Sequence, residues 1–157
     1  MCGLVGYFSK SNEVSREVCQ EMADTLVHRG PDDSGVWLDR HAGIVLGHRR
    51  LSIQDLSKLG HQPMESSSGR YVLSYNGEIY NFKLLQKELE QVGCRFKGCS
   101  DTETLLAAVE YWGIDKALKR FFGMFAFALW DKEKSELTLA RDRIGEKPLY
   151  ISFNEAS

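Results

Sequence analysis

Residues 123–130, which read Gly-Met-Phe-Ala-Phe-Ala-Leu-Trp, constrain the fold more than any other segment of this sequence. An almost wholly apolar run of this length and aromatic content is typical of a strand that is covered on both faces. Such a strand requires packing layers above and below its sheet. We therefore expect stacked layers rather than a bundle made only of helices.

Other segments rich in β-branched and aromatic residues predict further strands. These segments are residues 3–8, 35–39, 43–48, 51–54, 71–75, 136–140 and 149–153. Strand pairs alternate with helical segments, and the chain contains no internal repeat or Pro-rich linker. The expected class is α+β, with antiparallel sheets under helical layers and residues 1–157 forming one continuous domain.

Three segments have the apolar spacing of helices. The first places residues 14, 18, 22 and 26 on one face, and the turn-forming residues 29–33 predict that it stops near His28. Asn81 is expected to cap the second, which has residues 82, 85 and 89 on its face and ends at Gly93. The third begins at Asp101 and turns residues 104, 105, 108 and 112 inward.

Composition excludes several classes of protein. Apolar residues make up 43% of the chain and charged residues 27%, which excludes a disordered chain. The net charge is −2 and Lys and Arg do not cluster, so nucleic acid is not an expected partner. No apolar run approaches the roughly 18 residues of a membrane span, and the first residues lack the pattern of a secretory signal. A cytoplasmic location is therefore expected.

The four cysteines are Cys2, Cys19, Cys94 and Cys99. They form no Cys-x-x-Cys pair and have no nearby His that would complete a zinc site, so we expect no metal. A disulfide framework is not expected in a reducing compartment. Cys19 lies on a helical pattern and is interpreted as a small buried apolar side chain, which leaves Cys2 to explain.

Cys2 directly follows the initiator Met, and removal of Met1 would make it the first residue. The nucleophile and an α-amine would then belong to the same residue. A free thiol is only a few per cent thiolate at neutral pH, but an α-amine with a pKa of about 7.7–8.0 can accept its proton. The alternative is a chance cysteine at the end of an edge strand.

Several polar clusters offer partners for such a nucleophile. An inward-facing guanidinium from Arg49 or Arg50 suits a carboxylate, and only one of the two can face a ligand because neighbouring strand residues point to opposite faces. Asn76-Gly77 is by default a hairpin turn, but an amide beside a Gly N–H also suits an oxyanion. Asp101 belongs to a helix-capping pattern that needs no further role, although its carboxylate suits an ammonium group.

Eight blocks of the sequence, taken in order, resemble class II glutamine amidotransferases, and most of all the N-terminal glutaminase domain of glutamine-hydrolysing asparagine synthetases. The blocks are residues 1–3, 28–32, 48–53, 60–64, 76–81, 100–103, 123–128 and 140–143. This resemblance implies an N-terminal nucleophile hydrolase fold, a four-layer αββα sandwich with two mostly antiparallel sheets.

The resemblance also implies a role for each matching position. Cys2 matches the nucleophile, and Asn76 and Gly77 match the oxyanion donors. The positions that match substrate-binding groups are Arg50 for the carboxylate of L-glutamine, Glu78 and Asp101 for its ammonium, and Ile53 for backbone contacts. A glutaminase of this kind needs neither metal nor cofactor. ATP and magnesium are expected only in the synthetase domain that continues past this point in asparagine synthetases.

The expected reaction is therefore hydrolysis of L-glutamine to L-glutamate and ammonia, with a downstream synthetase domain as partner and a homodimer as a possible assembly. Two alternatives stay open. An N-terminal nucleophile amidohydrolase would act on another amide, and such a substrate would not need the clamp for a zwitterion. A non-catalytic module that binds glutamine or a partner would follow if Met1 is retained.

Overall fold

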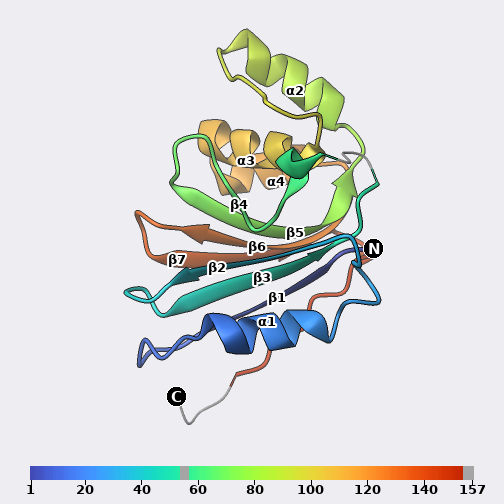
Figure 1. The fold of residues 1–157 in the computed structure, drawn as a ribbon. Coiled ribbons are helices and arrows are strands. Elements are labelled where there is room, and N and C mark those ends of the chain that lie inside the picture. The colour runs from blue at the N-terminus through green and yellow to red at the C-terminus, as the bar shows by residue number, and fades with distance from the viewer. Residues whose placement is uncertain (54–56, 154–157) are drawn as a thin grey trace.

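Two antiparallel sheets lie face to face between layers of helices in the computed structural model, which describes residues 1–53 and 57–153 (Figure 1). Helix α1 (Arg16–Asp24) covers the outer face of one sheet. Helices α2 (Phe82–Gln91), α3 (Asp101–Trp112) and α4 (Ile114–Arg120) lie on the other side of the sandwich. This arrangement confirms the predicted α+β class and the αββα order of layers.

The first sheet contains three strands in the order β1-β3-β2. They are β1 (Gly3–Phe8), β2 (Asp33–Asp39) and β3 (Ile44–Arg50). The central strand β3 pairs Arg49 with Gly3 and Arg50 with Asp33. The start of the chain therefore lies beside the end of β3, although nearly fifty residues separate them.

The second sheet has the order β4-β5-β6-β7. Its strands are β4 (Met64–Glu65), β5 (Tyr71–Ile79), β6 (Gly123–Asp131) and β7 (Glu136–Arg141). The edge strand β4 pairs only with Val72 and Leu73 of β5. Beyond these two residues, no strand within residues 1–53 and 57–153 pairs with the outer edge of β5, and this opening determines where the site lies.

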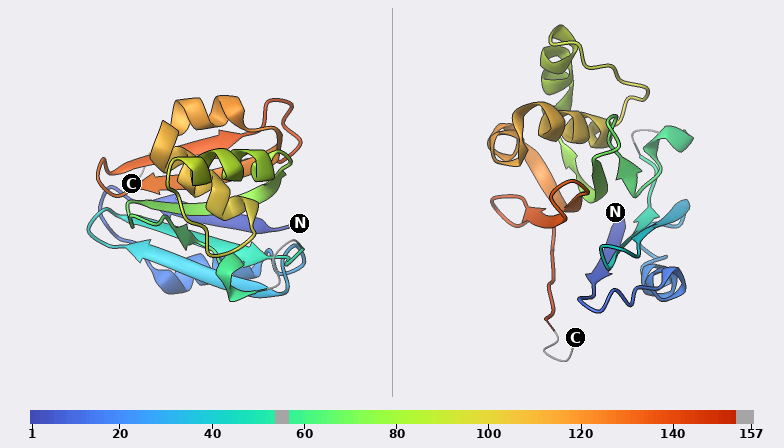
Figure 2. Two further views of the ribbon diagram at one scale, coloured as in Figure 1. Left: turned by 90° about the horizontal axis from the view of Figure 1, so that it is seen from above. Right: turned by 90° about the vertical axis from the view of Figure 1, so that its left-hand side faces the viewer.

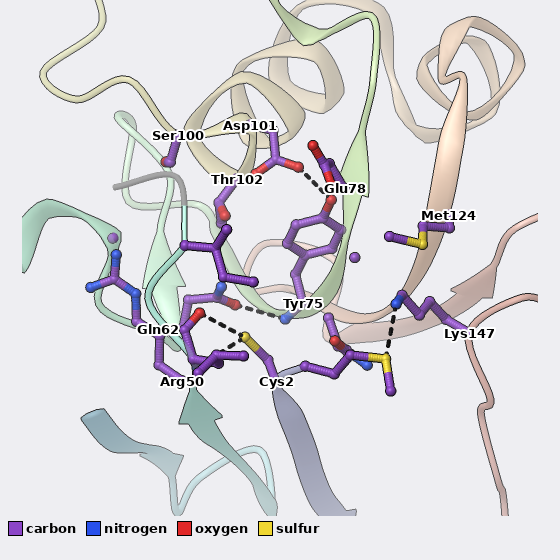
Figure 3. A pocket seen from close by; sticks show the side chains of 16 residues that line it. Cys2, Arg50, Gln62, Tyr75, Glu78, Ser100, Asp101, Thr102, Met124 and Lys147 are labelled. Atoms are coloured by element: carbon purple, nitrogen blue, oxygen red, sulfur yellow. Dashed lines mark hydrogen bonds between the residues drawn. The ribbon is translucent and has the colours of Figure 1, made fainter. Parts of the chain in front are cut away.

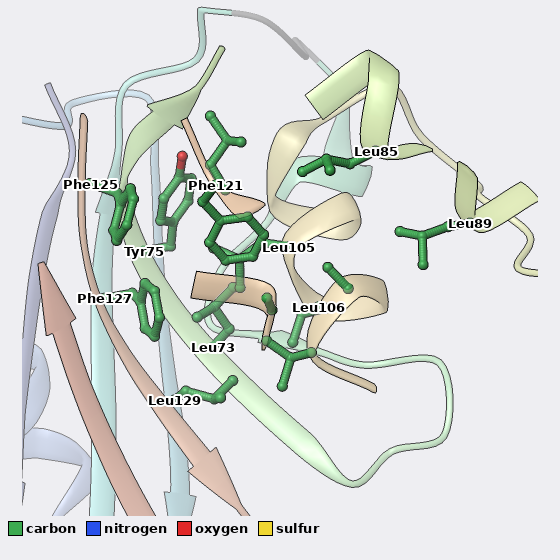
Figure 4. Close-up of a cluster of buried hydrophobic side chains, with 14 residues drawn as sticks. Leu73, Tyr75, Leu85, Leu89, Leu105, Leu106, Phe121, Phe125, Phe127 and Leu129 are labelled. Atoms are coloured by element: carbon green, nitrogen blue, oxygen red, sulfur yellow. The ribbon is translucent and has the colours of Figure 1, made fainter. Parts of the chain in front are cut away.

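Strand β6 is covered on both faces, as its apolar sequence predicts. Phe125, Phe127 and Leu129 pack with the helices in the larger core cluster (Figure 4). Ala128 and Trp130 pack against the other sheet in a second cluster. Burial of a large apolar side chain contributes about 1.5–3 kcal/mol to the free energy of folding. Because side chains of β6 point alternately to the helices and to the other sheet, they stabilise the contact of this sheet with both layers.

Two predicted strands are wrong. Residues 51–53 are not part of a strand, because side chains accept their backbone N–H groups. The Leu51 N–H donates to Cys2 Sγ, and the Ser52 N–H donates to Asp32 Oδ2. Gln54, the last residue of the predicted strand, lies outside the described residues. Residues 149–153 are mostly apolar but join no sheet, and the chain runs away from both sheets toward its C-terminus (Figure 2). The side chains of Tyr150 and Phe153 are about nine-tenths exposed. Apolar composition alone does not supply a strand with a partner.

The helices also differ in detail from the prediction. Helix α1 begins at Arg16 and buries Cys19 and Ala23, whereas Val18 is exposed, because the buried stripe follows the 3.6-residue period and not a strict interval of four. Asn81 occupies the N-cap position of α2, as predicted, but its side chain makes no capping hydrogen bond there. Its side chain instead donates to Arg120 O and accepts the N–H of Phe122. Helix α4 was not expected.

No helix within residues 1–53 and 57–153 is both long enough and apolar enough to cross a membrane.

His48 connects the two sheets. It is 1% exposed, and its Nε2 donates to Tyr75 O across the sandwich at 3.0 Å. A ring that donates from Nε2 is neutral when Nδ1 carries no proton. Burial lowers the pKa of His48 from 6.5 to about 4, so the folded protein keeps this ring uncharged.

This histidine should make stability depend on pH. Between about pH 6.5 and pH 4 the unfolded chain binds a proton that the folded chain does not, so the free energy of unfolding should fall on acidification, by roughly 3 kcal/mol in all. Urea unfolding at pH 7 and pH 5 measures the loss. Most of it should vanish in His48→Gln and persist in His41→Gln, whose side chain is exposed. An equal loss in all three proteins would show that His48 is not the cause.

Candidate active site

A cavity of about 130 Å³ opens at the end of the sandwich where Cys2 directly precedes β1 (Figure 3). Its wall comes from both sheets, the start of α3 and the loop after β7. It brings together every site residue predicted from the sequence: Cys2, Arg50, Ile53, Asn76, Gly77, Glu78 and Asp101. The cavity that was needed to join a thiol to cationic, acidic and amide groups is therefore present.

The Cys2 thiol is oriented by the segment that follows β3. Its Sγ accepts the Leu51 N–H at 3.4 Å and donates to Leu51 O at 3.8 Å. Arg29 Nε donates to the Cys2 carbonyl at 3.2 Å, which fixes the backbone as well. By contrast, Cys19 is fully buried and burial raises its pKa to about 11, so it is unsuited to act as a nucleophile.

The two arginines at the end of β3 point in opposite directions. Arg50 is buried on the cavity wall, where Nη1 donates to Ser57 O at 2.8 Å. Arg49 donates instead to Gly30 O and forms an ion pair with Asp24. The alternation of strand side chains thus places Arg50, and not Arg49, in the cavity.

Gly60 makes room for the Arg50 guanidinium. A Cβ added at this glycine would lie only 2.0 Å from Arg50 Nη2, so any side chain there would displace the cation. The sequence block 60–64 contains this glycine without indicating its task. Its role follows only from the contact between the short 3-10 helix Lys58–Gly60 and the Arg50 side chain at the end of β3.

Asn76 and Gly77 lie inside β5, so the default interpretation of Asn-Gly as a hairpin turn is wrong. They pair with Ala126 and Phe125 of β6. A Cβ on Gly77 would lie 2.4 Å from Met124 O. The glycine is therefore explained by the close approach of the β6 backbone rather than by a turn.

The open edge of β5 directs backbone N–H groups toward the site. The Tyr75 N–H donates to Gln62 Oε1 at 2.7 Å, and the Ile79 N–H donates to Asp101 Oδ2 at 2.9 Å. Because alternate residues of a strand turn their N–H groups to the same edge, the Gly77 N–H faces this edge too, at the cavity. The predicted oxyanion donor is thus a backbone group without a neighbouring strand.

Asp101 joins α3 to the end of β5. Its Oδ2 accepts the Tyr75 hydroxyl at 2.6 Å, as drawn in Figure 3, and it also accepts the Ile79 N–H. Ser100 caps the helix by accepting the Glu103 N–H, as its sequence pattern predicts. Burial raises the pKa of Asp101 despite these donors, and the nearby charge of Glu78 adds to the rise.

The remaining predicted residues occupy different depths. Glu78 lines the cavity near Asp101, so two carboxylates face the region where an ammonium group is expected. Ile53 is 73% exposed and stands at the mouth, which is compatible with a contribution from its backbone.

Sequence reasoning missed Gln62, Tyr75 and Lys147 as parts of this cavity. Gln62 accepts the Tyr75 N–H at the edge of β5. A single Gln in a loop or a single Tyr in a strand has no sequence pattern that indicates a site. Within the described residues, no group of three or more His, Cys, Asp or Glu side chains is placed to hold a metal ion.

A family model described as a glutamine amidotransferase domain matches residues 1–157. The chain belongs to this family. Membership confirms the resemblance seen in the sequence and makes the chain the glutamine-using component of an amidotransferase enzyme.

Similar proteins share much of this sequence. The chain is 42% identical to asparagine synthetase [glutamine-hydrolyzing] 3 of Bacillus subtilis strain 168, matching over all of this chain and 26% of that protein. It is 43% identical to asparagine synthetase [glutamine-hydrolyzing] 1 of the same strain, over 97% of this chain and 24% of that protein. The chain therefore spans about a quarter of the length of these relatives.

The fold has a counterpart among solved structures. Glutamine phosphoribosylpyrophosphate amidotransferase from B. subtilis, complexed with ADP and GMP, superposes with a TM-score of 0.74. The match covers 88% of this chain and 37% of the other at 19% identity. This likeness concerns the fold alone, and it agrees with the predicted four-layer sandwich of two antiparallel sheets between helices.

Proposed function

We propose that this chain hydrolyses L-glutamine to L-glutamate and ammonia through a thioester on Cys2, after removal of Met1. The observation that carries the proposal is the single cavity that joins the Cys2 thiol, the Arg50 guanidinium and the carboxylates of Glu78 and Asp101. Opposite charges at different parts of one small cavity suit a zwitterionic amino acid.

The charges suggest how glutamine lies in the cavity. Its carboxylate would pair with Arg50, whose planar guanidinium can donate two parallel hydrogen bonds. Its ammonium would lie between Glu78 and Asp101. With both ends held, the side-chain amide extends toward Cys2.

The chemistry requires only groups of this chain and water. The Cys2 α-amine takes the thiol proton as sulfur bonds to the amide carbon, and the Asn76 amide and Gly77 N–H stabilise the oxyanion. The amine then protonates the amide nitrogen of the substrate and the C–N bond breaks. Ammonia departs, and a thioester remains on Cys2. Water deprotonated by the same amine attacks the thioester carbon and the C–S bond breaks. The amine returns its proton to the Cys2 thiolate, and glutamate is released. We propose no metal or cofactor for this half-reaction.

The relatives suggest a use for the ammonia. Both Bacillus subtilis relatives are named glutamine-hydrolysing asparagine synthetases, and this chain corresponds to about a quarter of each. We therefore propose that residues 1–157 form the amidotransferase domain of such a protein. A synthetase domain that uses ATP and magnesium would receive the ammonia in the cytoplasm, and a homodimer is a possible assembly.

The alternative amide substrate has one observation in its favour. The chain is 35% identical to a protein named amidase chry2 of Gibberella zeae, over 99% of this chain and 24% of that protein. The clamp for a zwitterion favours glutamine over a simple acyl amide. Retention of Met1 would leave a binding module only, and the intact mass distinguishes the trimmed chain from the untrimmed one.

Release of glutamate by the trimmed protein tests the proposed function. Wild-type protein should convert L-glutamine to glutamate, and Cys2→Ala should abolish the conversion because no thioester can form. Cys99→Ala, which removes an exposed thiol, is the matched control and should retain activity. Equal glutamate release by wild type and Cys2→Ala would refute covalent catalysis at this residue.

Loss of one oxyanion donor should slow turnover. Asn76→Ala should lower kcat by about 10²–10³-fold, since the negative charge of the intermediate loses one of its two donors. Asn81→Ala serves as the control, because that side chain bonds to Arg120 O and Phe122 N. A decrease of less than about threefold in Asn76→Ala would remove Asn76 from this role.

The raised pKa of Asp101 should appear in the affinity for glutamine. As pH falls, Asp101 becomes protonated at a higher pH than an ordinary aspartate and no longer attracts the ammonium, so Kd should rise. Calorimetry on the trimmed Cys2→Ala protein separates this effect from turnover. In the same background, Asp101→Asn should bind weakly with little dependence on pH in the acid range. An unaltered pH dependence in that variant would contradict the assignment.

A further inference from the structure

Lys147 is a buried cation on the cavity wall that the proposed mechanism does not use. It is 5% exposed and lies in the loop that follows β7. Among the described residues, its ammonium contacts the Met1 sulfur at 3.2 Å (Figure 3). A lysine is rarely buried to this extent, so its charge in this position needs an explanation.

The loop holds Lys147 firmly in place. The Asp142 carboxylate is buried and accepts the N–H groups of Phe125, Ile144, Glu146 and Lys147. Although burial opposes ionisation, these backbone donors lower the pKa of Asp142 to about 2. The Lys147 backbone is thus hydrogen-bonded to a carboxylate that is ionised at neutral pH, and this bond holds it beside the cavity.

The contact with Met1 places the Lys147 ammonium near the future α-amine. The Met1 sulfur is five covalent bonds from the Cys2 nitrogen, so the two atoms are at most roughly 6 Å apart. Lys147 Nζ is therefore at most roughly 9 Å from the nitrogen that removal of Met1 would convert to an amine. Trimming would also remove the thioether that now contacts the ammonium.

Charged and titratable groups approach this end of the sandwich from every neighbouring element. They are Arg29 and Asp32 from the loop between α1 and β2, His48 and Arg50 from β3, Tyr75 and Glu78 from β5, Asp101 from α3, and Asp142 and Lys147 from the loop after β7. Arg29 donates to the Cys2 carbonyl, Arg50 donates to Ser57 O, and the neutral His48 donates to Tyr75 O.

These charges pose a problem for the amine. The carboxylates that suit a substrate ammonium, Glu78 and Asp101, would equally favour protonation of the Cys2 α-amine, and a protonated amine cannot accept the thiol proton. A fixed positive charge nearby has the opposite effect on the amine. Lys147 supplies such a charge on the wall where the chain begins.

We propose that Lys147 keeps the Cys2 α-amine uncharged at neutral pH by offsetting the negative charge of Glu78 and Asp101. The inference rests on the proposed function, because it concerns the base of that reaction. Lys147 acts through Cys2 and touches no reacting atom, so it is a positioning residue and not a catalytic one.

The variant that tests this is Lys147→Met, which keeps the length and apolar stem of the side chain and removes its charge. The acid limb of the pH profile of kcat/KM for glutamine should move up by about one pH unit, as expected for unit charges at this separation in a partly solvated site. Activity should recover at high pH. Lys147→Arg keeps the charge and should keep the wild-type limb, and Lys87→Met, on the exposed side of α2, should also leave it unchanged.

A second measurement does not depend on turnover. The rate at which an amine-reactive acetylating reagent labels the Cys2 α-amine of trimmed protein, followed by peptide mass spectrometry from pH 5 to pH 9, gives the titration of that group directly. The amine of Lys147→Met should become reactive about one pH unit higher than the wild-type amine. If this variant does not fold, as judged by circular dichroism, Lys147→Gln takes its place.

The outcomes separate the two proposals. Absence of glutamate release by wild-type protein at every pH would refute the proposed function. If the wild type is active and the neutral variants Lys147→Met and Lys147→Gln have the same acid limb and the same amine titration, the role of Lys147 is refuted. The proposed function would stand. A loss of activity that is uniform across pH, with an unshifted amine, would likewise refute this role of Lys147 and assign Lys147 a structural role.

Discussion

The open outer edge of β5 is the constraint on which the site depends. Strand β4 covers only two residues of that edge, and beyond them the backbone N–H groups need other partners. Gln62 satisfies Tyr75 and Asp101 satisfies Ile79, which leaves the N–H of Gly77 between them directed to the cavity. An incomplete sheet thus provides a preorganised donor without any special backbone geometry.

The sequence predicted much of the layered fold because its signals are local and periodic. The apolar run of β6 and the alternation that separates Arg49 from Arg50 each follow from the geometry of a single strand. The Ser100 cap and the burial of Cys19 follow from single turns of helix. The site residues came mainly from the resemblance to a family, and the cavity supports that assignment by bringing them together.

What the sequence did not predict depends on contacts between distant segments. Gly60 is explained by Arg50, and Gln62 by an N–H group thirteen residues away. The Asn76-Gly77 pair was open to two interpretations until its pairing with β6 excluded the turn. Residues 149–153 show the converse case, since strand-like composition does not form a strand when no edge is available. Local preference is outweighed in each case by tertiary context.

The proposed nucleophile and the proposed oxyanion donors belong to opposite sheets, because Cys2 directly precedes β1 and Gly77 lies in β5. The apolar layer between the sheets, with Ile44, Leu46 and Trp130 in it, therefore sets the gap across which sulfur must meet carbonyl. A misplacement of about 1 Å can slow an enzyme by about 10²-fold. Substitutions in this apolar layer, far from any glutamine atom, should consequently slow the proposed reaction in a protein that still folds. The distance between the sheets thus affects the rate of that reaction.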